Sequence, residues 1–268
     1  MVPFFSIITP VRNGEKFLNR YLRSLFDQTF TDFEVIVVDD KSHDESYRKL
    51  KKKTLHDERF LIISLNNEKE ISGPYLARNT AINFSKGKYI CFLDIDDYWL
   101  PNKLQRNYEI LSENQSVKFI FSNYIRYNLK AKKYFLRSPL IIFNIKFSLI
   151  FFNPIPLLTV CFERELLSKD IRFKPINHED FLFWNALLPR LSREMIFLDK
   201  KPLTIYSVYS SSLSSSKLTS IFWLFRIYRK RHGLFSAFLI IIFRFFIQLL
   251  IYINDRKIIF KNKSVEFL

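Results

Sequence analysis

The chain has 268 residues, with 42 Lys and Arg against 26 Asp and Glu, which gives a formal charge of +16 and a sequence pI near 9.7. The apolar fraction of 48%, which includes 30 Phe, can supply a large core and excludes an intrinsically disordered protein. With only 4 Gly and 2 Cys, a collagen-like protein, a disulfide framework and a zinc cluster are excluded, and a reducing compartment is predicted. The first residues lack a basic region and a cleavage site, so they predict a strand rather than a secretory signal.

The first 110 residues alternate short apolar strands with helical patterns. The predicted strands cover residues 4–9, 33–38, 60–65 and 89–93, and predicted helices begin near Phe17, Ser42, Gly73 and Pro101. Strands that alternate with helices of this length indicate βαβ units and a mostly parallel sheet. Ligands of such sheets bind beyond the carboxyl ends of the strands. The polar residues expected at those ends are Asn13, Asp39, Asp40, Asp94, Asp96 and Asp97.

The remainder of the chain is less regular. Its predicted elements are a strand at residues 118–122, a hairpin or long loop to about 156, a strand at 158–162, a helix after 178 and a Ser-rich link at 209–216. Two basic stretches, at residues 114–162 and 221–268, carry +14 of the net charge of +16. In the first stretch, basic residues alternate with aromatic ones, a pattern compatible with nucleic-acid binding or with a solvated face. It contains no recognised nucleic-acid motif, so we expect no nucleic-acid partner.

The most informative motif is a group of three carboxylates, Asp94, Asp96 and Asp97, directly after a predicted buried strand. Like charges this close repel one another, and burying them is costly unless a cation is present. Mg²⁺ and Mn²⁺ are typically held by one or two carboxylates together with substrate phosphates. The motif therefore indicates a divalent metal site, and the alternative is an acidic turn that caps the helix at Pro101.

The second predicted strand also ends in carboxylates, Asp39 and Asp40, which can accept hydrogen bonds from a base or a ribose. The alternative is a cap of the following helix. The first strand ends in a turn that runs from Thr9 through Pro10 to Asn13, where backbone N–H groups favour anions. This turn lacks the glycine pattern of a dinucleotide site and the lysine of a P-loop, so both of those sites are excluded.

Two further motifs carry charge toward the same region. Arg78 lies on the third predicted helix, where its guanidinium could bind a diphosphate with two N–H groups, the alternative being a surface arginine. Glu179 and Asp180 begin the helix after His178. A carboxylate near an enclosed sugar can take a proton from an attacking hydroxyl. The alternative for this acidic pair is compensation of the helix dipole.

As an ordered set, these motifs resemble the family 2 glycosyltransferases, which have the GT-A fold. The matching stretches are residues 6–13, 24–30, 35–42, 77–79, 87–101 and 179–184. The resemblance implies an α/β, GT-A-like domain at residues 1–215, with a mostly parallel sheet flanked by helices. Its nucleotide-sugar half would be residues 1–110 and its acceptor half residues 111–215. The resemblance also implies a nucleotide-diphosphate-sugar donor, most often a UDP-sugar, and Mn²⁺ or Mg²⁺.

On the donor side, the resemblance implies that Thr9 and Asp40 line the uracil site, with Asp39 close by. Pro10 and Asn13 are expected in the same site because they form the turn after the first strand.

At the reaction centre, the resemblance places Arg78 near the diphosphate or the base, Asp94 at the ribose or sugar and Asp96 on the metal, with Asp94 as a second metal ligand. It makes Asp180 the general base, with Glu179 either supporting that base or sharing the acceptor site.

The expected function is therefore inverting transfer of a sugar from a nucleotide-sugar to a glycan or lipid-linked glycan, in the synthesis of surface polysaccharide or lipopolysaccharide. Two alternatives remain open at this point: a nucleotidyltransferase on a related sheet, and a non-catalytic basic protein that binds a membrane or nucleic acid. An oligomer is compatible with the sequence.

The end of the chain, residues 216–268, is expected to be a basic and apolar helical tail. Residues 234–253 are long enough for a membrane span, but Arg244 near their centre would be costly in a bilayer. Basic residues on both sides favour a helix that lies on anionic lipid. A true span and a buried packing or oligomer helix are the alternatives. We expect a cytoplasmic protein, peripheral on the inner face of the cell membrane.

Overall fold

The computed structural model describes residues 2–65, 73–176, 178–209 and 217–255. The predicted Ser-rich link, apart from its first residue, and the basic end of the tail at 256–268 lie outside these ranges. The strands are β1 (Phe5–Val11), β2 (Phe33–Asp39), β3 (Phe60–Ser64), β4 (Tyr89–Phe92), β5 (Tyr98–Trp99), β6 (Phe119–Ser122), β7 (Tyr124–Asn128), β8 (Lys133–Arg137), β9 (Cys161–Glu163), β10 (Ile196–Asp199) and β11 (Thr204–Val208).

Eight α-helices lie within the described ranges. They are α1 (Leu18–Phe26), α2 (Ser46–Lys53), α3 (Pro74–Phe84), α4 (Lys103–Glu113), α5 (Ile145–Phe151), α6 (Glu179–Leu187), α7 (Lys217–His232) and α8 (Leu234–Asp255). Single turns of 3₁₀ helix occur at η1 (Glu15–Phe17), η2 (Leu157–Thr159), η3 (Arg164–Leu166), η4 (Leu188–Arg190) and η5 (Arg193–Met195).

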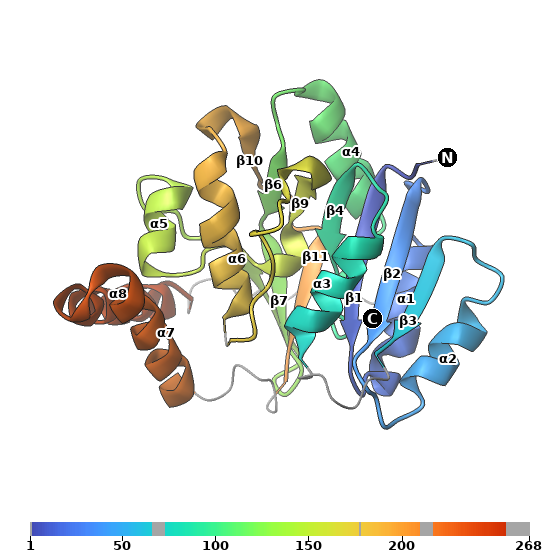
Figure 1. Cartoon of the computed structure of the whole chain (residues 1–268), viewed down its shortest axis with the longest axis horizontal. Helices are drawn as coiled ribbons and strands as arrows, with labels where there is room; N and C mark the ends of the chain where they lie inside the picture. Colours follow the sequence, from blue (N-terminus) through green and yellow to red (C-terminus); the bar gives the residue numbers. More distant parts are fainter. Residues whose placement is uncertain (1, 66–72, 177, 210–216, 256–268) are drawn as a thin grey trace.

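A seven-stranded sheet in the order β10-β6-β9-β4-β1-β2-β3 forms the centre of the molecule (Figure 1). Strands β4, β1, β2 and β3 are parallel neighbours, β6 and β10 are parallel to each other, and β9 runs antiparallel between β4 and β6. The central strands β1, β2 and β4 are almost fully buried because helices cover both faces of the sheet, whereas the edge strands β3 and β10 are only partly buried. The expected α/β fold, with a mostly parallel sheet flanked by helices, is confirmed.

The two faces of this sheet have separate hydrophobic cores. The core on one face receives side chains from α1, α2 and α4, and the core on the other from α3, α5, α6, α7 and α8. The second core contains a cluster of aromatic rings in which Phe92, Phe162 and Trp184 contact one another edge-on or stacked. This cluster fixes α6 against the end of β4, and the first residues of α6 are the predicted acidic pair.

A second sheet, in the order β5-β11-β7-β8, lies beside the first. Strand β5 follows the three carboxylates of the sequence motif and pairs with β11, so that residues more than 100 positions apart meet here. Strand β11 also pairs in parallel with β7, and β7 and β8 form a hairpin. The predicted hairpin after residue 122 is therefore present, but α5, which follows it, was not predicted.

Two other local predictions were wrong. The predicted strand at residues 158–162 consists of the 3₁₀ turn η2 followed by the shorter strand β9, because only the last residues reach the sheet edge between β4 and β6. The helix expected from Ser42 begins at Ser46 instead. Ser42 bonds the neighbouring turn, whereas Asp44 accepts both from the N–H of Glu15 in that turn and from the N–H of Ser46 at the start of α2.

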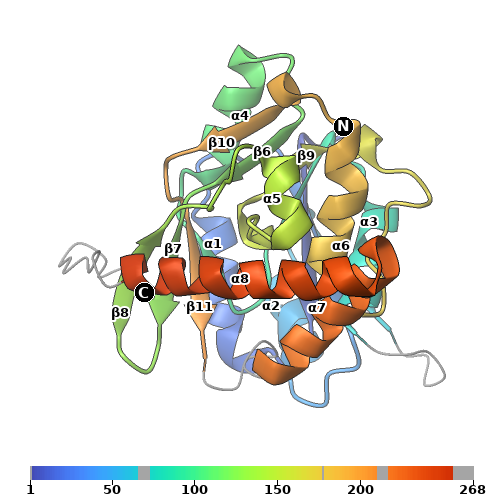
Figure 2. The ribbon, with the colours of Figure 1, turned by 90° about the vertical axis from the view of Figure 1, so that its left-hand side faces the viewer.

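The tail is helical over its described part, as expected. Figure 2 shows α8 lying across the outside of α5 and α6, with α7 beside it. Buried side chains of both helices, among them Leu224, Tyr228 and Ala237, belong to the same core as α6. Within the described ranges, no helix combines the length and the apolarity needed to cross a bilayer.

Candidate active site

The turn after β1 and the turn after β2 are bonded to each other. The backbone N–H of Asn13 donates to Ser42 Oγ (2.9 Å), and Asn13 Oδ1 accepts from the N–H of His43 (2.8 Å). Asn13 has a left-handed backbone (φ 51°), a conformation that Asn tolerates better than most residues. These bonds hold the carboxyl ends of two adjacent strands in a fixed relation.

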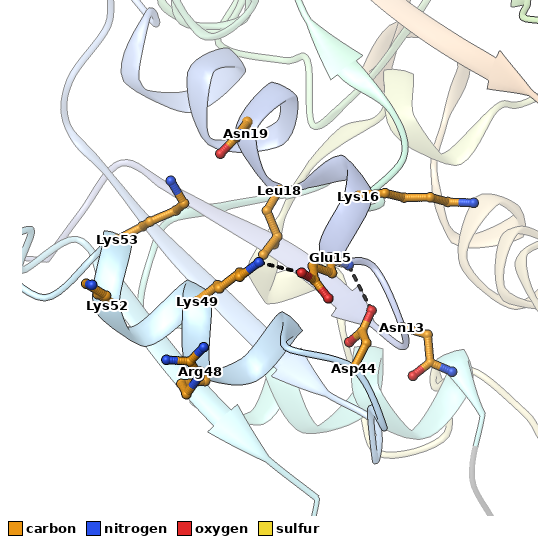
Figure 3. Close-up of a pocket in the computed structure, with 10 residues that line it drawn as sticks. All are labelled: Asn13, Glu15, Lys16, Leu18, Asn19, Asp44, Arg48, Lys49, Lys52 and Lys53. Atoms are coloured by element: carbon orange, nitrogen blue, oxygen red, sulfur yellow. Dashed lines mark hydrogen bonds and ion pairs between the residues drawn. The ribbon is translucent and has the colours of Figure 1, made fainter.

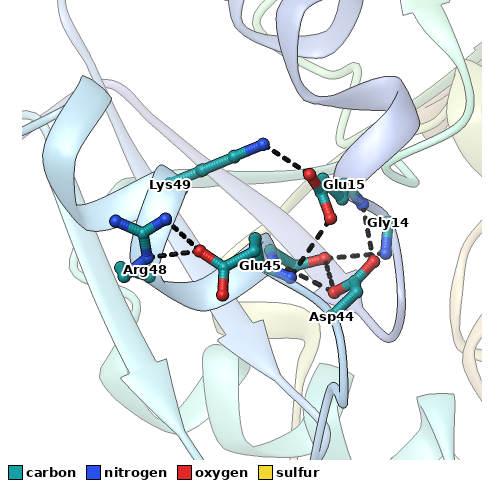
Figure 4. Close-up of polar contacts among 7 residues, drawn as sticks. Gly14, Glu15, Asp44, Glu45, Arg48 and Lys49 are labelled. Atoms are coloured by element: carbon teal, nitrogen blue, oxygen red, sulfur yellow. Dashed lines mark hydrogen bonds and ion pairs between the residues drawn. The ribbon is translucent and has the colours of Figure 1, made fainter.

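Further contacts extend the same junction (Figure 4). The N–H of Gly14 donates to Ser46 Oγ (2.8 Å), and the N–H of Glu15 donates to Asp44 Oδ2 (3.1 Å). Glu15 also pairs with Lys49 on α2. The start of α1 and the start of α2 therefore form one hydrogen-bonded unit.

The turn after β1 also packs closely against the acidic motif. A Cβ at Gly14 would lie 2.9 Å from Cγ1 of Ile95, so any larger residue would displace one of the two segments. Ile95 lies between Asp94 and Asp96 and is itself buried. The absence of a side chain at Gly14 thus allows the turn after β1 and the acidic motif to meet.

The predicted donor-site residues are placed as follows. Thr9 is fully buried, and its hydroxyl accepts a hydrogen bond from Tyr21 Oη (2.8 Å), so it supports the turn from behind. Asp39 is also buried, and its Oδ2 accepts from the N–H of Ser42 (3.1 Å). Asp40 lies 3.9 Å from the guanidinium of Arg12. Pro10 precedes these contacts within β1.

The three carboxylates after β4 have different environments. Asp97 is buried, and its Oδ1 accepts from the N–H of Ser207 in β11 (3.0 Å), which attaches the acidic segment to the second sheet. Helix α4 begins later, with Asn102 as its N-cap, so Asp97 does not cap it. Burial and the neighbouring Asp94 raise the pKa of Asp96 to about 6. A carboxyl group in this state favours a cation nearby.

Arg78 is the centre of the site. It projects from α3 and its side chain is 8% exposed; Nη2 donates to both carboxylate oxygens of Asp94 (2.8 and 2.9 Å), and Nη1 pairs with Glu179. Its guanidinium also lies 5.5 Å from the ring of Phe173. Arg78 therefore joins the end of β4 to the start of α6, and it is not a surface arginine.

The acidic pair at the start of α6 is largely removed from solvent. Burial raises the pKa of Glu179 to about 7, and Asp180 and Asp94 add to the rise, while Arg78 opposes it. Burial also raises the pKa of Asp180. A carboxyl group with a pKa nearer to neutral is suited to accepting a proton and later releasing it.

The carboxylate of Asp180 accepts two hydrogen bonds. Asn153 Nδ2 donates to Asp180 Oδ2 (2.7 Å), and the N–H of Phe181 donates to Oδ1 (2.8 Å). No sequence motif indicated Asn153, because this residue lies in an irregular segment after α5. Two residues earlier, the carbonyl of Phe151 accepts from Tyr228 Oη (2.5 Å) and from Arg244 Nη1 (3.3 Å). The tail is thus bonded to the segment that holds Asp180.

Arg20 is a second residue that the sequence did not indicate. It lies on α1, and its Nη1 donates to Ser207 Oγ (3.1 Å). Its guanidinium lies 5.5 Å from the ring of Tyr98 and its charge lowers the pKa values of Asp96 and Asp97, which burial raises. Arg20 therefore offsets part of the negative charge of the acidic motif.

A basic hollow of about 840 Å³ lies between α1 and α2 (Figure 3). Its lining residues are Asn13, Glu15, Lys16, Leu18, Asn19, Asp44, Arg48, Lys49, Lys52 and Lys53. None of the residues that Arg78 brings together lines this hollow. The hollow and the acidic cluster around Arg78 are therefore separate features, and of the predicted site residues Asn13 alone is among those that line the hollow.

The number of protein ligands available to a metal is small. In the part of the chain that the structure describes, no group of three or more His, Cys, Asp or Glu side chains is arranged to hold a metal ion. Asp94 is engaged by Arg78, whereas Asp96 is the carboxylate whose pKa burial raises to about 6. This donor set suits a hard cation that takes its remaining ligands from a diphosphate.

Known proteins resemble this chain over most of its length. An uncharacterized glycosyltransferase of Haemophilus influenzae is 31% identical over 87% of this chain and 90% of its own length. A second relative, the UDP-Glc:α-D-GlcNAc-diphosphoundecaprenol β-1,3-glucosyltransferase WfgD of Escherichia coli, is 30% identical over 81% of each chain.

Solved structures agree with these relatives. The structure of Staphylococcus aureus TarS 1–349 in complex with UDP-GlcNAc matches with a TM-score of 0.64 and 25% identity, over 79% of this chain and 60% of that chain. The mannosyltransferase PcManGT of Pyrobaculum calidifontis, in complex with GDP-Man and Mn²⁺, has the same fold at 14% identity and a TM-score of 0.55, over 89% of this chain and 65% of that one.

The sequence profile of glycosyl transferase family 2 matches residues 6–168 of this chain, which is more than half of its length. This match decides against the two alternatives that the sequence left open, a nucleotidyltransferase and a non-catalytic basic protein. The chain therefore belongs to glycosyl transferase family 2 and is a glycosyltransferase.

Proposed function

We propose that this glycosyltransferase transfers a hexose from a UDP-sugar to a lipid-linked glycan in the synthesis of a surface polysaccharide. The observation that carries the proposal is the junction made by Arg78, which joins the end of β4 to the acidic start of α6. The donor and acceptor classes are supported by the relatives, since WfgD acts on a diphosphoundecaprenol-linked sugar and TarS is solved with UDP-GlcNAc.

The donor would bind at the carboxyl ends of β1, β2 and β4. Asp39 and Asp40 would accept hydrogen bonds from the base or ribose, and Pro10 and Asn13 would form the rim of this site, with Thr9 buried behind them. The bonds between the turns after β1 and β2 support this assignment, because they fix the rim before a donor arrives.

Asp96, with Asp94 as a second ligand, would hold Mn²⁺ or Mg²⁺. When bound, the cation would offset the negative charge that develops on the leaving diphosphate. Arg78 would add positive charge on the same side of the site, and its pairing with Asp94 would also orient that carboxylate toward the ribose or sugar.

Asp180 would act as the general base. It would take the proton from an acceptor hydroxyl, whose oxygen then forms a bond to the anomeric carbon as the bond from that carbon to the diphosphate oxygen breaks. A single displacement of this kind inverts the configuration. Glu179 would support the base by keeping Arg78 in place, and Asn153 would orient the carboxylate of Asp180.

The division into a nucleotide-sugar half (1–110), an acceptor half (111–215) and a tail (216–268) also remains a proposal. It is supported by the position of the donor-side turns in the first half and of Asp180 in the second. The basic hairpin β7–β8 and the segment around α5 would face the diphosphate of a lipid-linked acceptor, and the protein would be peripheral on the cytoplasmic side of a membrane.

The test is release of the nucleoside diphosphate from a panel of UDP-, GDP- and dTDP-sugars with Mn²⁺, with and without a lipid-linked acceptor. We expect release to be fastest with a UDP-sugar and to depend on the metal. Asp96→Ala should abolish it, whereas the control Asp32→Ala, at an exposed position before β2, should not. A preference for another nucleotide would overturn the donor assignment, and full metal-independent turnover would overturn the role of Asp96.

A further inference from the structure

The polarity of α8 is opposite to that of a typical surface helix. Its only charged residue before Asp255 is Arg244, and the guanidinium of Arg244 points inward, where Nη1 donates to the carbonyl of Phe151 (3.3 Å). The inner side also carries Ala237, Ile240 and Ile247, whose side chains are buried. The arginine that would be costly within a bilayer is thus bonded to the protein.

The outer side of α8 is apolar and exposed. Its outward residues recur at helical spacing and are Leu234, Phe235, Phe238, Leu239, Ile242, Phe243, Phe245 and Phe246, with exposed fractions from 40% to 76%. Soluble monomers rarely leave a continuous apolar surface of this extent facing water. We call these eight residues the outer face of α8; Figure 2 shows that the helix lies across the outside of α5 and α6.

A neighbouring segment extends this face. Phe143, just before α5, is 90% exposed and has a left-handed backbone (φ 57°), which is unfavourable for a bulky side chain. A series of ring contacts leads from it through Phe147 and Phe151 to Phe243, with centroid distances of 5.2, 5.2 and 4.7 Å. Contact of the Phe143 ring with an apolar environment would offset the cost of this backbone conformation and of the exposed ring.

The charge beside the outer face is entirely positive. Arg229, Lys230 and Arg231 are exposed at the end of α7, three to five residues before Leu234, and neither α7 nor α8 contains an acid before Asp255. A two-fold pairing of two copies through this face would bring these cations toward each other. An anionic lipid surface would instead receive both the aromatic side chains and the cations.

We propose that the outer face of α8, together with Phe143 and the cations at the end of α7, is a docking surface for an anionic lipid bilayer on which the helix lies flat. This inference rests on the proposed function. An enzyme bound to the membrane surface would encounter a lipid-linked acceptor by diffusion within that surface. The bonds from Tyr228 and Arg244 to Phe151 keep the docked helices attached to the segment that positions Asp180.

The experiment is cosedimentation of the full chain with vesicles of phosphatidylcholine alone or mixed with phosphatidylglycerol, without donor or acceptor. We expect at least tenfold tighter binding to the anionic vesicles, weakened by salt. The combined variant Phe235→Ser, Phe238→Ser and Phe245→Ser should lose this binding. Leu55→Ser, in the turn after α2, and Phe84→Ser, at the end of α3, change exposed apolar positions elsewhere and should keep the binding.

A second variant tests the role of the cations. It combines Arg229→Gln, Lys230→Gln and Arg231→Gln, and it should lose the preference for anionic vesicles. Donor cleavage in solution should be retained by all variants, so failure to bind vesicles is separable from failure of the proposed function. The proposal is overturned if the wild type stays in the supernatant, or if the serine variant binds as well as the wild type. A dimer in analytical ultracentrifugation that the serine variant dissociates, without vesicle binding, would assign the face to a second copy.

Discussion

The proposed donor side of the site, at the turns after β1 and β2, and the proposed acceptor side, at the start of α6, are supported in different ways. On the donor side, the turns after β1 and β2 bond to each other through short segments that directly follow adjacent strands. On the acceptor side, Asp180 is held by Asn153 from the segment after α5, and Glu179 is held by Arg78 from α3, about 100 residues earlier.

This difference teaches where the site is most easily disturbed. Several independent hydrogen bonds hold the turns on the donor side together, so removal of one of them should have a limited effect on activity and stability. The acceptor side depends on a few long-range contacts to partly buried charges, and loss of one partner leaves a charge without compensation. We therefore expect larger effects from single substitutions on the acceptor side, in the order given below.

The largest effect is expected for Asp180→Asn, which removes the proposed base but keeps the shape of the side chain. The kcat should fall by about 10²–10⁴-fold because proton transfer loses its acceptor. Steady-state kinetics measure this, with thermal unfolding as the check on the fold. Full turnover by the Asn variant would show that another group takes the proton.

The second largest effect is expected for Arg78→Gln, because this substitution removes the cation between two carboxylates. We expect a loss of about 3–5 kcal/mol in the free energy of unfolding, measured in urea, since Asp94 and Glu179 then face each other without compensation. The matched control is Arg23→Ala, whose pair with Asp27 on α1 is exposed and should contribute less than about 0.5 kcal/mol. Equal losses for the two variants would contradict the buried junction.

The pH dependence of stability should report Glu179. Its pKa is raised to about 7 in the folded protein, so the folded state binds this proton more tightly than the unfolded state does. The stabilisation is fully present below the ordinary value of 4.5 and is lost as the pH rises through 7. Glu179→Gln should therefore flatten the decrease in unfolding free energy between pH 4.5 and 7.5, and an unchanged slope would contradict the assignment.

Asn153→Ala should have a smaller effect on rate but a distinct effect on the pH profile. The amide of Asn153 stabilises the charged form of Asp180, so its loss should raise the pKa of that carboxyl further. The acid limb of kcat/KM should move to higher pH, and activity should recover when the pH is raised. Asn83→Ala, exposed on α3, is the control. A uniform loss at all pH values would indicate a structural role only.

The smallest effect is expected on the donor side. Ser46→Ala removes the acceptor of the N–H of Gly14, at a cost of about 1 kcal/mol. The KM for the donor should rise by about fivefold while kcat stays nearly constant. Ser112→Ala, exposed on α4, should leave both unchanged. A loss larger than that of Asn153→Ala would reverse the comparison between the two sides.

Several parts of this molecule could be predicted from the sequence because their signals are local. The strands β1, β2 and β4 are continuous apolar runs that end in polar residues, and parallel strands bring such ends to one edge. The helix that begins with Glu179 and Asp180 was also expected, and it is present. The family could be inferred because these local signals occur in a fixed order.

Other features depend on contacts that no local pattern encodes. Asn153 lies in an irregular segment, and only the packing of α5 against α6 brings it to Asp180. A helix was expected to begin near Ser42, but the hydroxyl of Ser42 accepts from the N–H of Asn13 because the two turns meet. In both cases, a short polar side chain bonds whichever backbone or carboxylate the tertiary fold places beside it.

The sequence by itself determined the α/β class, the family and the acidic residues at the strand ends, since these depend on periodicity and order along the chain. It also determined that the C-terminal segment is apolar and basic, with Arg244 in its middle. Only the tertiary structure decided that Arg244 turns inward to Phe151, because a helix exposes a different side according to what it packs against. The same packing leaves the phenylalanines of α8 on the outside of the molecule.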